Sequence, residues 1–254
     1  MDRNKAAYKL KDFGPLYIIK LDDQPERWDW MKEQLDYWQL ENYERISAFD
    51  GRHSDLSEII SGRYPNAVTP PEIGCVTSHL KAIKHWYETS DSDYAIFMED
   101  DCDFVSVSHW PFSWKEVMRR IPYDWDCFQI AVINPRKLVA NIHPRYVDDY
   151  STAAFVVNRR YAEKLMHFHC RGDKFKLDNG VRPRAVADDL IYNAGKTYAM
   201  PLLLYKLELG SSIHEDHVEV FHKNSRLGLD HFWVNQATDL PIDSFFQYDT
   251  HELG

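Results

Sequence analysis

Five consecutive residues, Glu99 to Asp103, place four carboxylates directly after an apolar stretch rich in β-formers. Four acids at the end of a buried strand repel one another, which is costly unless a cation neutralises them. Dense carboxylate oxygens suit Mg²⁺ or Mn²⁺, which can also bridge a diphosphate. Asp100, Asp101 and Asp103 are therefore candidate metal ligands. A solvated acidic turn is the alternative interpretation.

A second acidic pair, Asp188-Asp189, lies in a stretch from 185 to 194 that is typical of a short helix. Only one of two adjacent helical residues can point fully into a site. That residue could act as the general base for a hydroxyl group. From spacing alone, a pair of helix-terminal charges facing water is the better explanation.

Single side chains that could contact a ligand follow other predicted elements. Arg27, just after the first predicted strand, could meet a phosphate or a base, and Asp50 could accept hydrogen bonds from a ribose. The simpler alternatives are a surface arginine and a turn-forming Asp-Gly pair. His214 and His217 follow the last predicted strand, where a histidine could complete a metal site built mainly of carboxylates.

The elements that would position these residues alternate between strands and helices. Residues 15–21 predict a buried strand, 25–38 an amphipathic helix and 43–49 a second strand. This β-α-β order favours a parallel sheet, whose strand ends are where ligands bind in open α/β folds. A helix is expected after Pro70. Further strands are expected at 94–98, 125–133, 152–158 and 198–207, and a mobile loop at 171–184.

Composition limits the class of protein. The 254 residues are 44% hydrophobic and 28% charged, which is typical of a globular chain. The net charge of −10 argues against a nucleic-acid partner, which requires basic surfaces. Four dispersed cysteines without a CxxC pair do not indicate a zinc finger. No apolar stretch approaches the length of a membrane span, and the N-terminus lacks an apolar leader, so we expect a cytoplasmic location.

Read in order, these segments resemble glycosyltransferase family 25, which includes lipopolysaccharide and collagen galactosyltransferases. Residues 17–27 resemble the opening strand and turn of the family, although Lys20 replaces the usual asparagine. Residues 48–51 and 94–101 resemble two later blocks. The most specific match is Glu72-Ile-Gly-Cys-Val-Thr-Ser-His79. The resemblance extends over about residues 15–213.

The resemblance implies one GT-A-type, Rossmann-like α/β domain with a mostly parallel sheet over residues 1–217, and a tail, 218–254, packed on it. It further implies an inverting transfer of galactose, or secondly glucose, from a UDP-sugar to a glycan or protein hydroxyl, with Mn²⁺ or Mg²⁺. The residues that correspond to family positions are Arg27, Asp50, Ser78, His79, Asp100 and Asp101 for the nucleotide, Asp100, Asp101, Asp103 and His214 for the metal, and Asp188 or Asp189 as the base.

Two other functions are compatible with the same residues. Asp101-x-Asp103 after an apolar strand also resembles the nucleophile motif of haloacid-dehalogenase phosphatases. That motif normally lies near the start of a chain, whereas here it follows two β-α units. The third possibility is a non-catalytic protein that binds a UDP-sugar or a glycan.

Overall fold

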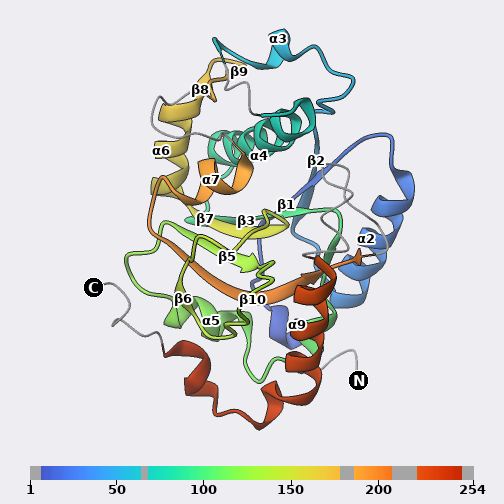
Figure 1. Cartoon of the computed structure of the whole chain (residues 1–254), viewed down its shortest axis with the longest axis vertical. Coiled ribbons are helices and arrows are strands. Elements are labelled where there is room, and N and C mark those ends of the chain that lie inside the picture. Colours follow the sequence, from blue (N-terminus) through green and yellow to red (C-terminus); the bar gives the residue numbers. More distant parts are fainter. Residues whose placement is uncertain (1–6, 64–67, 178–185, 208–221, 248–254) are drawn as a thin grey trace.

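The computed structural model describes residues 7–63, 68–177, 186–207 and 222–247 (Figure 1). Its centre is a sheet of strand order β2-β1-β3-β7-β5-β10-β4, with β6 paired to β10. The strands are β1 (Leu16–Lys20), β2 (Tyr43–Ser47), β3 (Tyr94–Glu99), β4 (Cys102–Asp103), β5 (Cys127–Ala131), β6 (His143–Pro144), β7 (Ala154–Asn158) and β10 (Thr197–Tyr205). A separate hairpin joins β8 (Cys170–Arg171) to β9 (Lys174–Phe175).

Most of the long strands run in one direction. The pairs β1–β2, β1–β3 and β5–β10 are parallel, whereas β7 is antiparallel to both β3 and β5. Every residue of β1 and β5 is buried, as expected for strands covered on both faces. The predicted Rossmann-like α/β fold with a mostly parallel sheet is confirmed, and β7 is the long strand that departs from the parallel direction.

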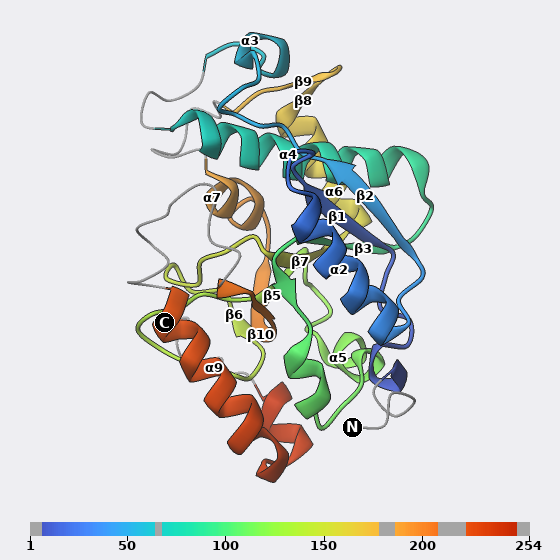
Figure 2. The same cartoon turned by 90° about the vertical axis from the view of Figure 1, so that its right-hand side faces the viewer.

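Helices cover both faces of this sheet (Figure 2). The helices of the described residues are α2 (Pro25–Trp38), α3 (Leu56–Ile59), α4 (Pro70–Thr89), α5 (Trp114–Arg120), α6 (Arg159–His169), α7 (Ala187–Tyr192) and α9 (Lys223–Asn235). Short 3-10 turns are η1 (Tyr8–Leu10), η2 (Val105–His109), η5 (Ala237–Asp239) and η6 (Ile242–Phe246). None of the helices in the described part of the chain is long and apolar enough to cross a membrane.

The two faces hold separate cores because side chains alternate along each strand. Ile18 packs in one core with residues of α2, α5 and α9. Its neighbours Tyr17 and Ile19 pack in the other core with residues of α4, α6 and α7. The domain is therefore three layered, with the sheet in the middle, and the carboxyl ends of its parallel strands share one edge.

The chain after residue 221 contains a helix that its weak periodicity does not reveal. Helix α9 spans 13 residues and buries Leu229, Phe232 and Trp233. Trp233 stacks on Phe245 of η6, with ring centroids 6.0 Å apart. All four side chains belong to the core that also contains α2 and α5. The helix includes Gly228, a weak helix former, so tertiary packing rather than propensity stabilises it.

Candidate active site

A pocket lies beyond the carboxyl ends of β1, β2 and β3. Five of the side chains predicted to contact a ligand line it, namely Arg27, Asp50, Ser78, His79 and Asp100. Lys20 and Glu99, the last residues of β1 and β3, line the same pocket. Residues that are 80 positions apart in the chain meet there because neighbouring parallel strands end at one edge.

Two glycines bring α4 against the segment that follows β2. A Cβ atom on Gly51 would lie 1.7 Å from the Pro70 carbonyl oxygen, and one on Gly74 would lie 2.6 Å from the Phe49 carbonyl oxygen. The close approach lets Ser78 Oγ accept a hydrogen bond from the Phe49 amide at 2.8 Å. Ser78 Oγ also donates to the Gly74 carbonyl at 2.6 Å. Ser78 thus joins α4 to the wall of the pocket.

Arg27 holds the first two acids of the turn after β3. Its Nε and Nη2 lie 2.8 and 2.6 Å from Asp100 Oδ1, and Nη2 lies 3.1 Å from Asp101 Oδ2. The three side chains are 12%, 7% and 18% exposed, so this ion pair is largely shielded from water. Arg27 is therefore a buried counter-ion of the acidic turn, because its position near the start of α2 faces the end of β3.

One arginine does not neutralise the whole acidic turn. Burial, reinforced by the charge of Glu99, raises the pKa of Asp101 to about 7 even though Arg27 opposes the shift. Burial also raises the pKa of Asp100. Asp100 Oδ2 and Asp101 Oδ1 are buried and have no hydrogen-bond partner. Carboxylate oxygens without partners, on two consecutive residues, are the ligand type that a hard divalent cation prefers.

The third acid of the turn, Asp103, has partners for both oxygens. Asp103 Oδ1 accepts from the Val105 amide at 2.9 Å, and Oδ2 accepts from Arg226 Nη2 at 3.0 Å. Arg226 comes from α9, so the sequence pattern alone could not reveal this contact. A metal on Asp103 would have to displace the arginine. His214, the remaining ligand expected from the resemblance, and His217 lie outside the described residues.

Glu99 belongs to a different cluster, which the sequence did not single out. Within the described ranges, the group of three potential ligands whose ligand atoms lie within 4.8 Å of one another is Cys75, His79 and Glu99. Glu99 Oε1 lies 3.1 Å from His79 Nε2 and accepts from Thr152 Oγ1 at 2.9 Å. Cys75 and His79 are four residues apart on α4, and this spacing was the available signal. Burial raises the pKa of the Cys75 thiol well above its usual value.

Asp50 is held in its charged form at the mouth of the same pocket. Arg52 donates two side-chain hydrogen bonds to it, at 2.9 and 3.0 Å. His53 Nδ1 lies 2.8 Å from Asp50 Oδ2. These contacts, with Arg52 first, lower the pKa of Asp50 well below its usual range. Asp50 is thus an ionised acceptor with a fixed orientation.

Of the pair on α7, Asp188 is the more enclosed residue. Its Oδ1 is buried without a hydrogen-bond partner. Burial raises its pKa to about 6, with Arg145 opposing and the charges of Glu99 and Asp189 adding to the rise. Asp189 Oδ1 instead accepts from Asn193 Nδ2 at 3.2 Å. A carboxyl group with this pKa can take up a proton near neutral pH.

Residues in the first half of the chain match a known protein family. Residues 13–110 match the model of glycosyltransferase family 25, described as an LPS biosynthesis protein. The predicted resemblance is confirmed over these residues, and the match supports glycosyltransferase activity in general. It includes the Arg27 contact, both interlocking glycines, Glu99 at the end of β3 and the three acids of the turn after it.

Other comparisons add less. No curated protein matches the chain. Among solved structures, A197 from STIV is similar at 12% sequence identity, with 74% of this chain and 82% of that chain covered and a TM-score of 0.42.

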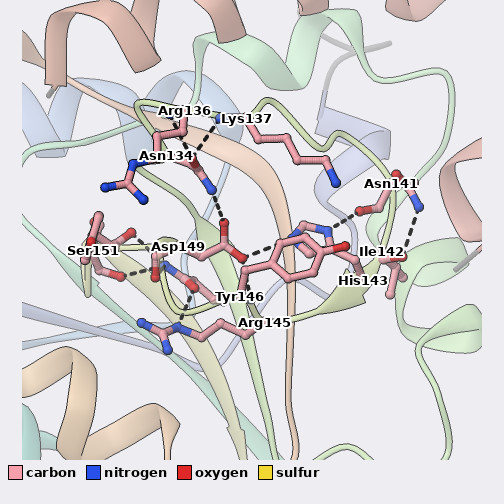
Figure 3. A network of polar contacts seen from close by, with 12 residues as sticks. Asn134, Arg136, Lys137, Asn141, Ile142, His143, Arg145, Tyr146, Asp149 and Ser151 are labelled. Carbon is pink, nitrogen blue, oxygen red and sulfur yellow. Dashed lines mark hydrogen bonds and ion pairs between the residues drawn. The ribbon is translucent and has the colours of Figure 1, made fainter. Parts of the chain in front are cut away.

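Beyond the residues matched to family 25, a network of polar contacts includes Arg145, Asp149 and Ser151 (Figure 3). Gln129 Nε2 donates to the carbonyls of Tyr150 and Ser151 at 2.8 and 3.0 Å. Tyr192 Oη donates to the same Ser151 carbonyl at 2.8 Å. Ser151 has a φ of 93°, which is strained for a residue with a side chain, and its backbone opposes the rise that burial causes in the pKa of Asp188. The network therefore stabilises the strained backbone at Ser151.

Three further polar residues, Arg145, His143 and Asp149, lie at or just after β6 beside this network. Arg145 Nε donates to Gln129 Oε1 at 3.2 Å, and its guanidinium lies 4.7 Å from the ring centroid of Tyr192. Asp149 Oδ2 lies 3.1 Å from His143 Nε2, and both side chains are at most 3% exposed. Burial alone would raise the pKa of Asp149, but the hydrogen bonds from His143 and Asn134 lower it overall.

Proposed function

We propose that this protein is an inverting, metal-dependent glycosyltransferase that moves a hexose from a UDP-sugar to a hydroxyl group of a glycan or protein. Galactose is the first candidate sugar and glucose the second. One observation supports the proposal most. The residues matched to family 25 form a pocket at the carboxyl edge of the sheet, and burial, with the charge of Glu99 in that pocket adding to its effect, raises the pKa of the carboxyl group of Asp188.

The pocket offers the chemistry that a nucleoside diphosphate requires. Asp50 can accept hydrogen bonds from ribose hydroxyls as a carboxylate, because the hydrogen bonds from Arg52 lower its pKa and keep it ionised. Asp100 and Asp101 would hold a divalent cation through the oxygens that lack partners. Such a cation supplies positive charge to the departing diphosphate. Arg27 keeps both carboxylates in place and limits their repulsion.

Asp188 is the proposed general base. As the acceptor oxygen attacks the anomeric carbon, its proton passes to the Asp188 carboxylate. The bond between the anomeric carbon and the diphosphate oxygen breaks, and its electron pair leaves with UDP. A direct displacement inverts the anomeric centre and passes through an oxocarbenium-like transition state.

The family match also separates this function from the phosphatase alternative. Residues 13–110 include Asp101 and Asp103, the two acids on which the phosphatase interpretation depends. Those acids contact Arg27 and Arg226. The match therefore favours sugar transfer over a phospho-aspartate mechanism.

Donor turnover tests the proposal. UDP release from UDP-galactose and UDP-glucose should require Mn²⁺ or Mg²⁺ and should stop in EDTA. Asp188→Asn should lower the rate by about 10²–10⁴-fold, as expected for a lost general base. Asp189→Asn is the matched control, because it changes the neighbouring helical carboxylate, and it should keep most of the activity. Tight UDP binding without any turnover would identify a non-catalytic protein. Failure to bind any UDP-sugar would refute the proposal.

A further inference from the structure

Lys20 is a buried lysine at the floor of the pocket. It is the last residue of β1 and only 3% exposed. Lysine is almost never fully buried unless it is paired with an acid. The ammonium of Lys20 donates to the carbonyl of Leu21, but no carboxylate of the described residues lies within ion-pair distance. A buried ammonium with a single neutral partner calls for a further anionic partner.

The other strong cations of the pocket are already paired. Arg27 binds Asp100 and Asp101, and Arg52 binds Asp50 through two hydrogen bonds. Of the three lysine and arginine side chains that line the pocket, Lys20 is the one with no carboxylate contact among the described residues. Positive charge in this pocket is thus available to an incoming ligand mainly at Lys20.

Charges around Lys20 partly support its protonated form. Burial lowers the pKa of Lys20, and the nearby charge of Arg45 adds to this effect. Asp100, Asp22 and Asp23 act in the opposite direction from beyond contact distance. A phosphate next to the ammonium would compensate for the cost of burial, because an opposite charge stabilises the charged form.

We propose that Lys20 binds a phosphate oxygen of the nucleoside diphosphate in this pocket. The inference rests on the proposed function, and it adds a contact between the side chain of Lys20 and the diphosphate. An ammonium has three hydrogen-bond donors and no acceptor. The asparagine that is usual at this position in family 25 has both donors and an acceptor. Lys20 therefore selects for an anion rather than for a group that must donate a hydrogen bond. Because the chain itself supplies part of the positive charge, UDP should remain bound, more weakly, when the divalent cation is removed.

Calorimetric binding of UDP and of uridine tests this role. The variants are Lys20→Met, which keeps the aliphatic stem, and Lys20→Asn. In EDTA we expect both to weaken UDP binding at least 10-fold and uridine binding less than about 2-fold. With saturating Mn²⁺ the loss for UDP should be smaller, since the cation then supplies most of the charge. Lys81→Met is the matched control, because Lys81 is also partly buried and donates to a strand-end carbonyl, that of Ser47, but does not line the pocket.

The outcomes separate this inference from the proposed function. Equal loss of UDP and uridine binding, or no loss of either, would overturn the role of Lys20 while UDP binding by the unaltered protein stands. If the unaltered protein bound no UDP even with Mn²⁺, the proposed function would fail and this inference with it. Thermal unfolding of each variant shows whether it is folded. If Lys20→Met did not fold, the Lys20→Asn comparison would decide.

Discussion

Arg226 on α9 donates a hydrogen bond to Asp103 Oδ2 at 3.0 Å, and the two side chains are only 14% and 15% exposed. The same guanidinium binds Asp230 at 2.9 Å and the carbonyl of Tyr205 at the end of β10. Helix α9 is thus bound to the acidic turn through Asp103, whereas α2 is bound to it through Asp100 and Asp101. An arginine and a divalent cation would compete for the same carboxylate oxygen.

Removing this competitor should strengthen metal binding. We expect Arg226→Met to raise the affinity for Mn²⁺ about 3- to 10-fold in a direct titration, because Asp103 Oδ2 becomes available. Unfolding should become easier by about 1–3 kcal/mol, since Asp103 and the Tyr205 carbonyl lose a buried partner. Arg120→Met is the control, because Arg120 pairs with Asp243 at the surface. An unchanged affinity for Mn²⁺ would show that Asp103 is not a metal ligand.

Loss of Arg27 should destabilise the fold in a pH-dependent way. Arg27→Met leaves Asp100 and Asp101 buried beside Glu99 without a counter-ion, which should cost about 3–5 kcal/mol at pH 8. The cost should shrink toward pH 5, because the pKa of Asp101 is already raised to about 7 and a neutral acid needs no cation. Urea unfolding at the two pH values measures the difference. Arg45→Met is the control, because it breaks an exposed ion pair with Asp22. It should cost less than about 1 kcal/mol of stability at both pH values. A cost for Arg27→Met that is equal at both pH values would contradict this account.

The raised pKa of Asp188 predicts opposite effects on stability and on activity. Its folded-state pKa of about 6 exceeds the value of about 3.9 in an unfolded chain. The folded state therefore binds the proton more tightly, and stability falls as pH rises from about 4 to 6. Asp188→Asn should stabilise the protein by about 2–3 kcal/mol at pH 8 and hardly at pH 4.

Activity should instead increase with pH over the same range. The base acts only when it is ionised, so kcat should rise through about pH 6 and then reach a plateau. A pH–rate profile that is flat between pH 5 and 8 would be incompatible with Asp188 as the base. Asp189→Asn should leave the midpoint close to that of the unaltered protein.

Gln129 should act on the reaction through Ser151. Gln129→Leu removes the donor shared by the carbonyls of Tyr150 and Ser151, which should cost about 1–3 kcal/mol. The Ser151 backbone lowers the pKa of Asp188, so a displaced turn should move the midpoint of the pH–rate profile above about 6. Tyr192→Phe removes one donor to Ser151 and should give a smaller shift in the same direction. Lower stability with an unmoved midpoint would limit Gln129 to a structural role.

Local sequence signals predicted most elements on the edge of the sheet that forms the pocket. Alternating apolar strands and helices predicted β1, α2, β2, α4 and β3, because each has a clear period and flanking breaker residues. The dense acids after residue 98 marked the carboxyl end of β3. The same reasoning missed α9, whose buried face consists of a few large residues that stabilise a helix only when they reach a core.

The sequence by itself determined the α/β class, the succession of strands and helices along the chain up to β3 and the positions of the acids, because these depend on neighbours within a few residues. Only the tertiary structure decided which partner each acid has. Asp101 contacts Arg27 from 74 positions away, Asp103 contacts Arg226 from 123 positions away, and Glu99 contacts Thr152 from 53 positions away. Such pairs depend on the order of strands and on how helices pack across the sheet, and spacing along the chain does not encode them. The same holds for Lys20. Its burial without a carboxylate partner depends on how the layers of the folded domain pack around it, which the sequence does not show.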